Sequence, residues 1–264
     1  MLVNYEGAEF KVGWSSSIER HLIKQAVKKK LGRWIGKPSQ PDAYLEWSRS
    51  LLTKKPFSIV VDVGANIGTT VLPLAVEYPT TKFFAIEPHP LPASSLIQNC
   101  QNNHVQNVSL LSAAIGLEKT AQIHTCPTNS GGHRLTGFQG RKDIEKCAIF
   151  GPINVPMRTL SDVFTDFSIK HCDILKIDTE GYEFFVLESL GNFCPDYVIA
   201  EYGPEGLRQA GKSGWEVIAL MLKKGYRCAV LGSNISIDCE KEIPSVPDFT
   251  VIDLLFSLKK QQAH

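Results

Sequence analysis

The sequence predicts an α/β fold in which helices cover both faces of a mostly parallel β-sheet. Short apolar runs of strand length alternate with helical patterns from residue 57 to the end of the chain. These runs are continuous rather than alternating apolar and polar, which is typical of strands buried on both faces. A turn with two glycines, residues 62–68, joins the first run to the next helix. These observations favour an open sheet whose ligands bind at the carboxyl ends of its strands.

The expected elements fall into a preamble and one domain. In the preamble, residues 1–55, we expect strand structure over 5–12, a helix after the serines 15–17 and a second helix over 42–52. In the domain, residues 56–264, we expect strands over 57–63, 82–86, 108–111, 173–177, 197–200, 226–231 and 250–258. We expect the main helices over 69–78, 90–103, 182–190 and 215–224. The irregular segment 117–160 is predicted to be an insertion, and the preamble to pack on the domain core.

Composition narrows the class of protein. Apolar residues make up 43% and charged residues 21% of 264 residues, enough to bury a sizeable core. The net charge of +1 gives no reason to expect nucleic acid or an anionic membrane as partner. No run approaches the roughly 18–20 apolar residues of a membrane span, and the start lacks a signal-peptide pattern. The seven cysteines form no CxxC pair, which disfavours a zinc ribbon and fits reduced thiols in the cytoplasm.

The turn after the first strand is the most informative motif. It reads Asp62-Val-Gly64-Ala-Asn66-Ile-Gly68, followed by Thr69. Glycines allow a sharp turn and a close approach to a ligand, and the helix that follows directs its N-terminus at the ligand. The motif departs from the dinucleotide pattern G-x-G-x-x-G, because Asn66 replaces a glycine. The acidic Asp62 would repel a pyrophosphate but attract a sulfonium and an ammonium. The motif therefore favours S-adenosylmethionine over NAD.

Further acidic residues follow other strands. Glu87, before Pro88, ends the second strand 25 residues after Asp62, where a carboxylate can accept hydrogen bonds from both ribose hydroxyls. Asp178 and Glu180 follow the strand over 173–177. These two side chains could orient an acceptor and take its proton, or hold Mg²⁺. The alternative for the nearby Glu183 is a purely structural role at the start of a helix.

The next strand ends in Glu201 and Tyr202. Because the carboxyl ends of parallel strands meet at one edge of a sheet, both are candidates for contact with the acceptor. A structural role for Glu201 is an equal alternative.

These motifs, in this order, resemble the FkbM-type methyltransferases. The resemblance rests on the 62–68 loop, Glu87-Pro88, Asn129-Ser-Gly-Gly132 and the run from Leu175 to Glu183, and it covers about residues 55–205. It implies a Rossmann-like fold with a seven-stranded sheet, S-adenosylmethionine as donor, and mostly O-methylation of natural products, glycans or glycolipids.

The resemblance also implies roles for residues. The 62–68 loop would hold the methionine part of the donor and Glu87 its ribose. The segment Ser112, Ala113 and Ala114 would border the adenine, and Asp178 and Glu180 would line the reacting centre. Asn129 would lie beside the pocket. His133, directly after the glycines, is a further candidate base because histidine titrates near neutral pH.

Several alternatives stay open at this point. The acceptor is a small molecule, a glycan or a peptide, and N-methylation of a peptide is the first alternative to O-methylation. An NAD-dependent oxidoreductase would also use a glycine loop and Glu87. A non-catalytic module could keep the donor pocket, and a nucleic-acid methyltransferase could share the fold. The sequence does not determine metal dependence or oligomeric state.

Overall fold

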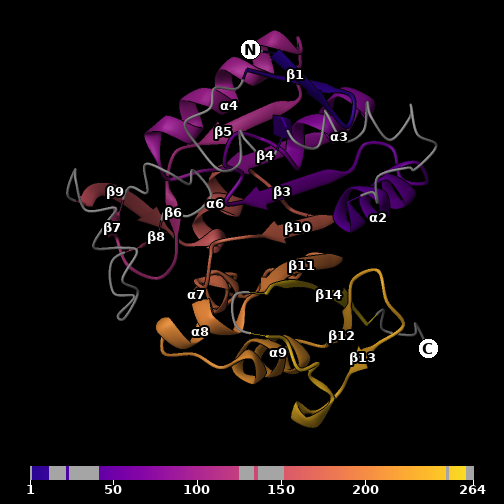
Figure 1. Ribbon diagram of the computed structural model, residues 1–264, viewed down its shortest axis with the longest axis vertical. Helices are drawn as coiled ribbons and strands as arrows, with labels where there is room; N and C mark the ends of the chain where they lie inside the picture. Colours follow the sequence, from indigo (N-terminus) through magenta and orange to yellow (C-terminus); the bar gives the residue numbers. More distant parts are fainter. Residues whose placement is uncertain are drawn as a thin grey trace.

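The computed structural model describes residues 2–11, 22–23, 42–124, 134–135, 152–247 and 250–259. The described residues form one large sheet of eight strands in the order β13-β12-β14-β11-β10-β3-β4-β5. Figure 1 shows these strands stacked from β5 at the top to β13 at the bottom. The strands are β3 (Ile59–Val63), β4 (Lys82–Ile86), β5 (Val108–Leu111), β10 (Ile174–Ile177), β11 (Tyr197–Tyr202), β12 (Tyr226–Val230), β13 (Ser236–Ile237) and β14 (Ile252–Leu258).

The sheet is mostly parallel, as the sequence predicts. Strands β5, β4, β3, β10 and β11 run parallel, whereas β14 lies antiparallel between β11 and β12. All seven expected strands are present, and the predicted Rossmann-like α/β fold class is confirmed. The eighth strand, β13, adds two residues at the edge next to β12.

Helices cover both faces of the sheet because successive strand residues point to opposite sides. On β3, for example, Val60 packs in one apolar cluster, whereas Val61 and Val63 pack in the other. One cluster includes residues of α2 (Ala43–Leu52), α3 (Val71–Glu77) and α4 (Pro90–Asn102). The opposite cluster includes residues of α6 (Leu160–Asp166), α7 (Glu183–Glu188), α8 (Pro204–Gln209) and α9 (Gly214–Lys223). The short helices α6 and α8, of seven and six residues, were not among the helices expected from the sequence.

A second, four-stranded sheet lies beside the main one, in the order β6-β9-β7-β8. Its strands are β6 (Ala114–Ile115), β7 (Thr120–His124), β8 (Arg134–Leu135) and β9 (Pro152–Arg158). In Figure 1 it lies at the end toward which β3 and β10 point. The sheet therefore takes up part of the predicted insertion and begins slightly before it.

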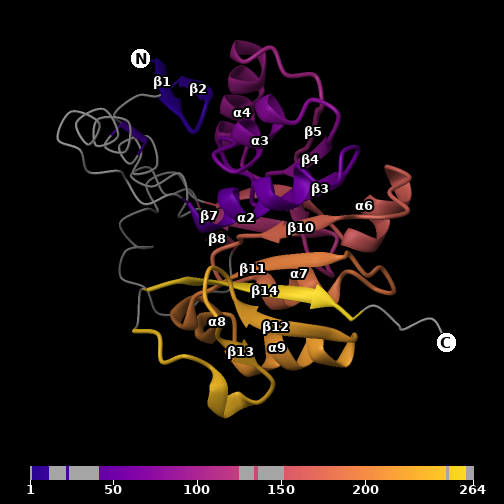
Figure 2. The same cartoon turned by 90° about the vertical axis from the view of Figure 1, so that its right-hand side faces the viewer.

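The described part of the preamble contains a hairpin, the helical residues Leu22 and Ile23, and the ten-residue helix α2. The rest of the helix expected after the serines 15–17 lies outside the described residues. Strands β1 (Leu2–Tyr5) and β2 (Ala8–Lys11) pair antiparallel around a turn at Glu6 and Gly7, so the expected strand structure over 5–12 is a hairpin. Figure 2 shows the hairpin beside α3 and α4. Residues of the hairpin and of α2 pack in the same apolar cluster as α3 and α4. The predicted division of the chain into a preamble and a domain at residue 55 stays a prediction.

None of the described helices is both long enough and apolar enough to cross a bilayer.

Asn99 on α4 links the hairpin to the glycine loop. Its fully buried side chain accepts a hydrogen bond from the Lys11 amide at 2.9 Å and donates one to the Ile67 carbonyl at 3.1 Å. We predict that Asn99→Ala lowers the free energy of unfolding by about 1–3 kcal/mol, because the buried Ile67 carbonyl and the partly buried Lys11 amide lose their partner. Urea unfolding measures this. The exposed Gln98 on the same helix is the matched control, and Gln98→Ala should change stability by less than about 0.5 kcal/mol. Equal effects of the two substitutions would contradict this account.

Candidate active site

A cavity of about 190 Å³ opens at the carboxyl ends of β3, β4, β10 and β11. Ten of the residues predicted from sequence to belong to the site line it: Gly64, Asn66, Thr69, Glu87, Pro88, Ala113, Ala114, Asp178, Glu180 and Glu201. The structure thus brings together side chains from five separate segments of the chain, as expected where parallel strands end at one edge.

Gly64 allows the loop after β3 to pass against the loop after β10. Its φ of +87° lies in the left-handed region, and a Cβ built there would collide with the backbone carbonyl oxygen of Asp178. The Asp178 amide donates to the Val63 carbonyl at 2.9 Å, which extends the pairing of the two strands into their loops. The loop is also tied to β4, because the Gly64 and Ala65 amides donate to the Ile86 carbonyl at 2.9 and 3.1 Å.

Asp62 lies beneath this loop rather than in the cavity wall. Its side chain is fully buried and accepts a hydrogen bond from the Thr70 hydroxyl through Oδ2. Its Oδ1 has no hydrogen-bond partner among the described residues. Burial raises the pKa of Asp62, and the charge of Lys176 partly opposes this. Asp62 is placed to support Thr70, which lines the cavity, and to add negative potential below it.

Glu87 connects the glycine loop to the end of β4. It is buried and accepts hydrogen bonds from the Asn66 amide at 2.9 Å and from the His89 amide at 2.8 Å. Burial raises the pKa of Glu87 to about 7, although these two hydrogen bonds favour the carboxylate. A carboxylate held in this way at the cavity wall suits hydroxyl donors of a ligand.

Asp178 and Glu180 line the cavity from the loop after β10. The Asp178 Oδ2 atom lies 2.9 Å from the Lys176 ammonium. Glu180 has a φ of +57°, an unusual left-handed conformation for glutamate. The next residue, Gly181, has a φ of +111°, and a Cβ there would lie 2.6 Å from the backbone of Gly206 on α8. Close packing against α8 therefore fixes this turn and the position of Glu180.

Glu183 has the structural role that its position at a helix start suggests. It is buried, and its Oε1 accepts from the amides of Thr179 and Gly181 at 2.9 and 3.1 Å and from the Thr179 hydroxyl at 3.0 Å. Burial raises the pKa of Glu183 despite these bonds. The side chain thus shapes the loop that carries Asp178 and Glu180.

Glu201 and Tyr202 end β11 on opposite faces of the sheet. Glu201 lines the cavity, and burial together with the negative charges of Asp178, Glu180 and Glu183 raises its pKa to about 10. Tyr202 packs in the apolar core and does not line the described cavity. Its ring lies against Gly214 at the start of α9. The structure therefore separates these two neighbouring candidates.

The other predicted residues lie around the cavity or outside the described part of the chain. Gly68, with a φ of +93°, packs against Leu96 of α4 and does not line the cavity. Ser112 is exposed and directly precedes the lining residue Ala113. Asn129 and His133 lie outside the described residues, so their predicted roles stay predictions.

Five lining residues were not expected from the sequence to contact a ligand: Val63, Thr70, Ile115, Ile123 and Thr179. Tyr182, which the sequence left open as a pocket or core residue, also lines the cavity. Thr70 and Thr179 are neighbours of recognised motif residues and could have been included. Ile115 and Ile123 come from the small sheet, and no local pattern indicates that this sheet closes the cavity.

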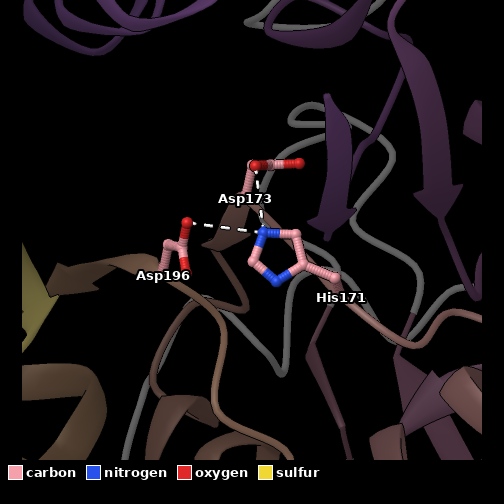
Figure 3. A group of neighbouring side chains, drawn as sticks. All are labelled: His171, Asp173 and Asp196. Atoms are coloured by element: carbon pink, nitrogen blue, oxygen red, sulfur yellow. Dashed lines mark hydrogen bonds and ion pairs between the residues drawn. The ribbon is translucent and has the colours of Figure 1, made fainter. Parts of the chain in front are cut away.

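A different ionisable cluster lies at the opposite, amino ends of the strands. His171, Asp173 and Asp196 bring one ligand atom each within 4.8 Å of one another (Figure 3). The Lys55 ammonium already forms ion pairs with both carboxylates, at 2.9 Å to Asp196 Oδ2. The described residues form no other group of three or more metal-type ligands at this spacing. At this spacing the predicted Mg²⁺ site at Asp178 and Glu180 thus has no third His, Cys, Asp or Glu ligand among the described residues, and the Lys176 ammonium already contacts Asp178.

S-adenosylmethionine fits the cavity better than Mg²⁺ does. Glu87 offers a carboxylate to hydroxyl donors, and the orphan oxygen of the buried Asp62 adds negative potential beneath the loop. A ligand with a sulfonium and an ammonium complements this excess of carboxylates.

Comparison with known proteins agrees with this geometry. A sequence profile described as the Methyltransferase FkbM domain matches residues 62–228. Methyltransferase sdnD of Sordaria araneosa is 26% identical over 202 residues, which cover 66% of this chain and 75% of that protein. The 31-O-demethyl-FK506 methyltransferase FkbM of Streptomyces tacrolimicus is 29% identical over 154 residues, which cover 50% of this chain and 59% of that protein.

Solved structures are similar only distantly. M. jannaschii TYW2 in complex with AdoMet has a TM-score of 0.45 and 15% identity, over 98% of this chain and 86% of that one. A putative caffeoyl-CoA O-methyltransferase from Staphylococcus aureus has a TM-score of 0.49 and 11% identity, over 90% of this chain and 98% of that one.

The profile covers more than half of the chain and contains the glycine loop, Glu87 and the Asp178–Glu183 turn. It confirms the resemblance seen in the sequence, favours methyl transfer over the nicotinamide alternative, and supports S-adenosylmethionine as the donor. This chain belongs to the FkbM methyltransferase family.

Proposed function

We propose that this protein transfers the methyl group of S-adenosylmethionine to a hydroxyl of a natural product, sugar or glycolipid, with Asp178 as general base assisted by Glu180. The observation that supports this most is the presence of Asp178 and Glu180 in the same cavity as the glycine loop and Glu87. A hydroxyl acceptor must lose a proton as its new bond to carbon forms, and carboxylates beside the donor site are suited to accept it.

The proposed donor site follows the lining of the cavity. The segment from Gly64 to Thr70 would hold the methionine part, and Glu87 would accept hydrogen bonds from the ribose hydroxyls. Ala113, Ala114 and Ile115 would border the adenine as an apolar wall. When bound, S-adenosylmethionine supplies an activated methyl group on its sulfonium.

The chain's own contribution is alignment and proton transfer. Fixing the acceptor in line with the donor lowers the entropic part of the barrier. The backbone of Asp178 is held by the hydrogen bond from its amide to the Val63 carbonyl, which limits how far the residue must reorganise. Glu201, whose raised pKa of about 10 favours the neutral acid at pH 7, would then donate rather than accept a hydrogen bond toward the acceptor.

Glu87 should make donor binding depend on pH. Ribose hydroxyls donate to the carboxylate, so binding favours the ionised form, whereas the raised pKa of about 7 favours the acid below neutrality. The affinity for S-adenosylhomocysteine should therefore be highest above pH 7 and fall by up to about tenfold per pH unit below it. Glu87→Ala should weaken binding about 10- to 100-fold at pH 8 and flatten this dependence.

Isothermal titration calorimetry between pH 5.5 and 8.5 measures this effect. Glu188→Ala, at the exposed end of α7, is the control and should match the wild type. A Glu87→Ala protein that binds as tightly as the wild type would contradict the ribose assignment. Wild-type protein that binds neither the donor nor its product would contradict the proposed function.

Asp178→Asn tests the proposed base. The amide keeps an oxygen for Lys176 but loses basicity, so donor affinity should change less than about threefold while turnover falls about 10²–10⁴-fold. Turnover is measured as S-adenosylhomocysteine release with a panel of alcohols, glycosides and peptides, which also decides between O- and N-methylation. The control is Glu188→Gln, which should retain wild-type turnover. Unchanged turnover of Asp178→Asn would remove Asp178 from the role of base.

A further inference from the structure

Lys176 is a buried cation that the proposed chemistry does not use directly. It lies on β10 between Asp62 of β3 and Ile199 of β11, and its exposed fraction is 5%. An ammonium buried in this way is costly unless it is paired. Burial lowers the pKa of Lys176, but the charges of Asp178, Asp62 and Asp253 outweigh this and raise it well above its ordinary value. Lys176 is therefore a permanent cation inside the fold.

Four carboxyl groups and a phenol surround this cation from every element packed against it. Asp178 follows its own strand, Asp62 lies on β3, and Glu201 and Asp253 lie opposite each other on β11 and β14. The fully buried Tyr44 of α2 closes the cluster, with its ring centroid 5.6 Å from the ammonium.

The carboxyl groups are not equivalent partners. Burial raises the pKa of Asp62 and Asp253, and burial and like charges raise that of Glu201 to about 10. Asp178 is the carboxylate with an oxygen at hydrogen-bond distance from the ammonium, 2.9 Å, and its side chain is 37% exposed, toward water and the cavity it lines. A charge-assisted hydrogen bond of this kind fixes the direction of a carboxylate as well as its charge.

We propose that Lys176 is a positioning residue of the active site. From the α2 face of the sheet, its ammonium holds Asp178 as an ion-paired anion at the cavity wall. The inference rests on the proposed function, since it assigns Lys176 a role through the proposed base. Lys176 approaches from the α2 side of the sheet and does not line the cavity. Its effect on the acceptor is therefore indirect.

Lys55, in the turn after α2, provides a control ion pair away from the cavity. It too pairs with two carboxylates, Asp173 and Asp196, but these lie at the amino ends of β10 and β11. A substitution there removes an ion pair from the same strands without touching the cavity.

The test follows the protonation of Asp178 directly. Protein labelled with [4-¹³C]aspartate is titrated by NMR, and the Asp178 carboxyl signal is identified by its absence in Asp178→Asn. In Lys176→Met the titration midpoint of Asp178 should rise by about one pH unit or more, because the anion loses its cation. In Lys55→Met the midpoint should equal that of the wild type. An equal midpoint in Lys176→Met and the wild type would overturn the inference.

A second variant covers the case in which Lys176→Met does not fold. The double variant Lys176→Met/Asp62→Asn removes the cation together with a fully buried carboxyl group, which limits the uncompensated charge. The Asp178 midpoint in the double variant should lie about one pH unit or more above that in Asp62→Asn alone, which accounts for the lost Asp62 charge, and equal midpoints in these two variants would equally overturn the inference.

Different experimental results would overturn the role of Lys176 and the proposed function. Calorimetry with S-adenosylhomocysteine on the same wild-type sample tests the donor site. No binding would overturn the proposed function, whereas binding together with an unmoved Asp178 midpoint would overturn only the role of Lys176. A positioning role also predicts that the pH profile of turnover moves upward in Lys176→Met, which loss of stability alone does not produce.

Discussion

The site depends on the contact between the loops that follow the two central strands. Strands β3 and β10 are hydrogen-bonded in parallel register and end side by side, so their loops must share one space. They do so because Gly64 has no side chain where the Asp178 carbonyl passes. This contact sets the distance between the donor loop and the proposed base, and a second contact of the same kind, between Gly181 and Gly206, fixes the far end of the turn. The lack of side chains at Gly64 and Gly181 therefore allows the backbone contacts that position Asp178 and Glu180.

The second constraint is charge. The cavity and the layer beneath it contain Asp62, Glu87, Asp178, Glu180 and Glu201 around the cation Lys176. Burial of so many carboxyl groups pushes several pKa values upward, which lowers the negative charge but does not remove it. A positively charged donor relieves this strain, whereas a pyrophosphate would increase it. The same reasoning explains why an acidic residue at the start of the glycine loop distinguishes this site from a dinucleotide site.

The sequence predicts the cavity residues at the strand ends better than the others, for a physical reason. Glu87, Asp178 and Glu201 follow buried strands, and the geometry of a parallel sheet alone brings strand ends together. Tyr202 could have been separated from Glu201 in advance, because neighbouring strand residues point to opposite faces. By contrast, Ile115 and Ile123 reach the cavity through the small sheet, whose strands are far apart in sequence. Likewise, the left-handed conformation of Glu180 follows from packing against α8 and has no local signal.

The predicted boundary at residue 55 has no clear linker in the sequence, and described segments before it contact residues beneath the site. Tyr44 of α2 lies against the ammonium of Lys176, and Asn99 joins the N-terminal hairpin to the Ile67 carbonyl in the glycine loop. Both contacts are buried and polar, so neither partner can be replaced by water without cost. The preamble therefore supports the glycine loop and the charged cluster from the α2 face of the sheet. The sequence pattern changes between the preamble and the domain, whereas the contacts of Tyr44 and Asn99 connect the two parts in the folded protein.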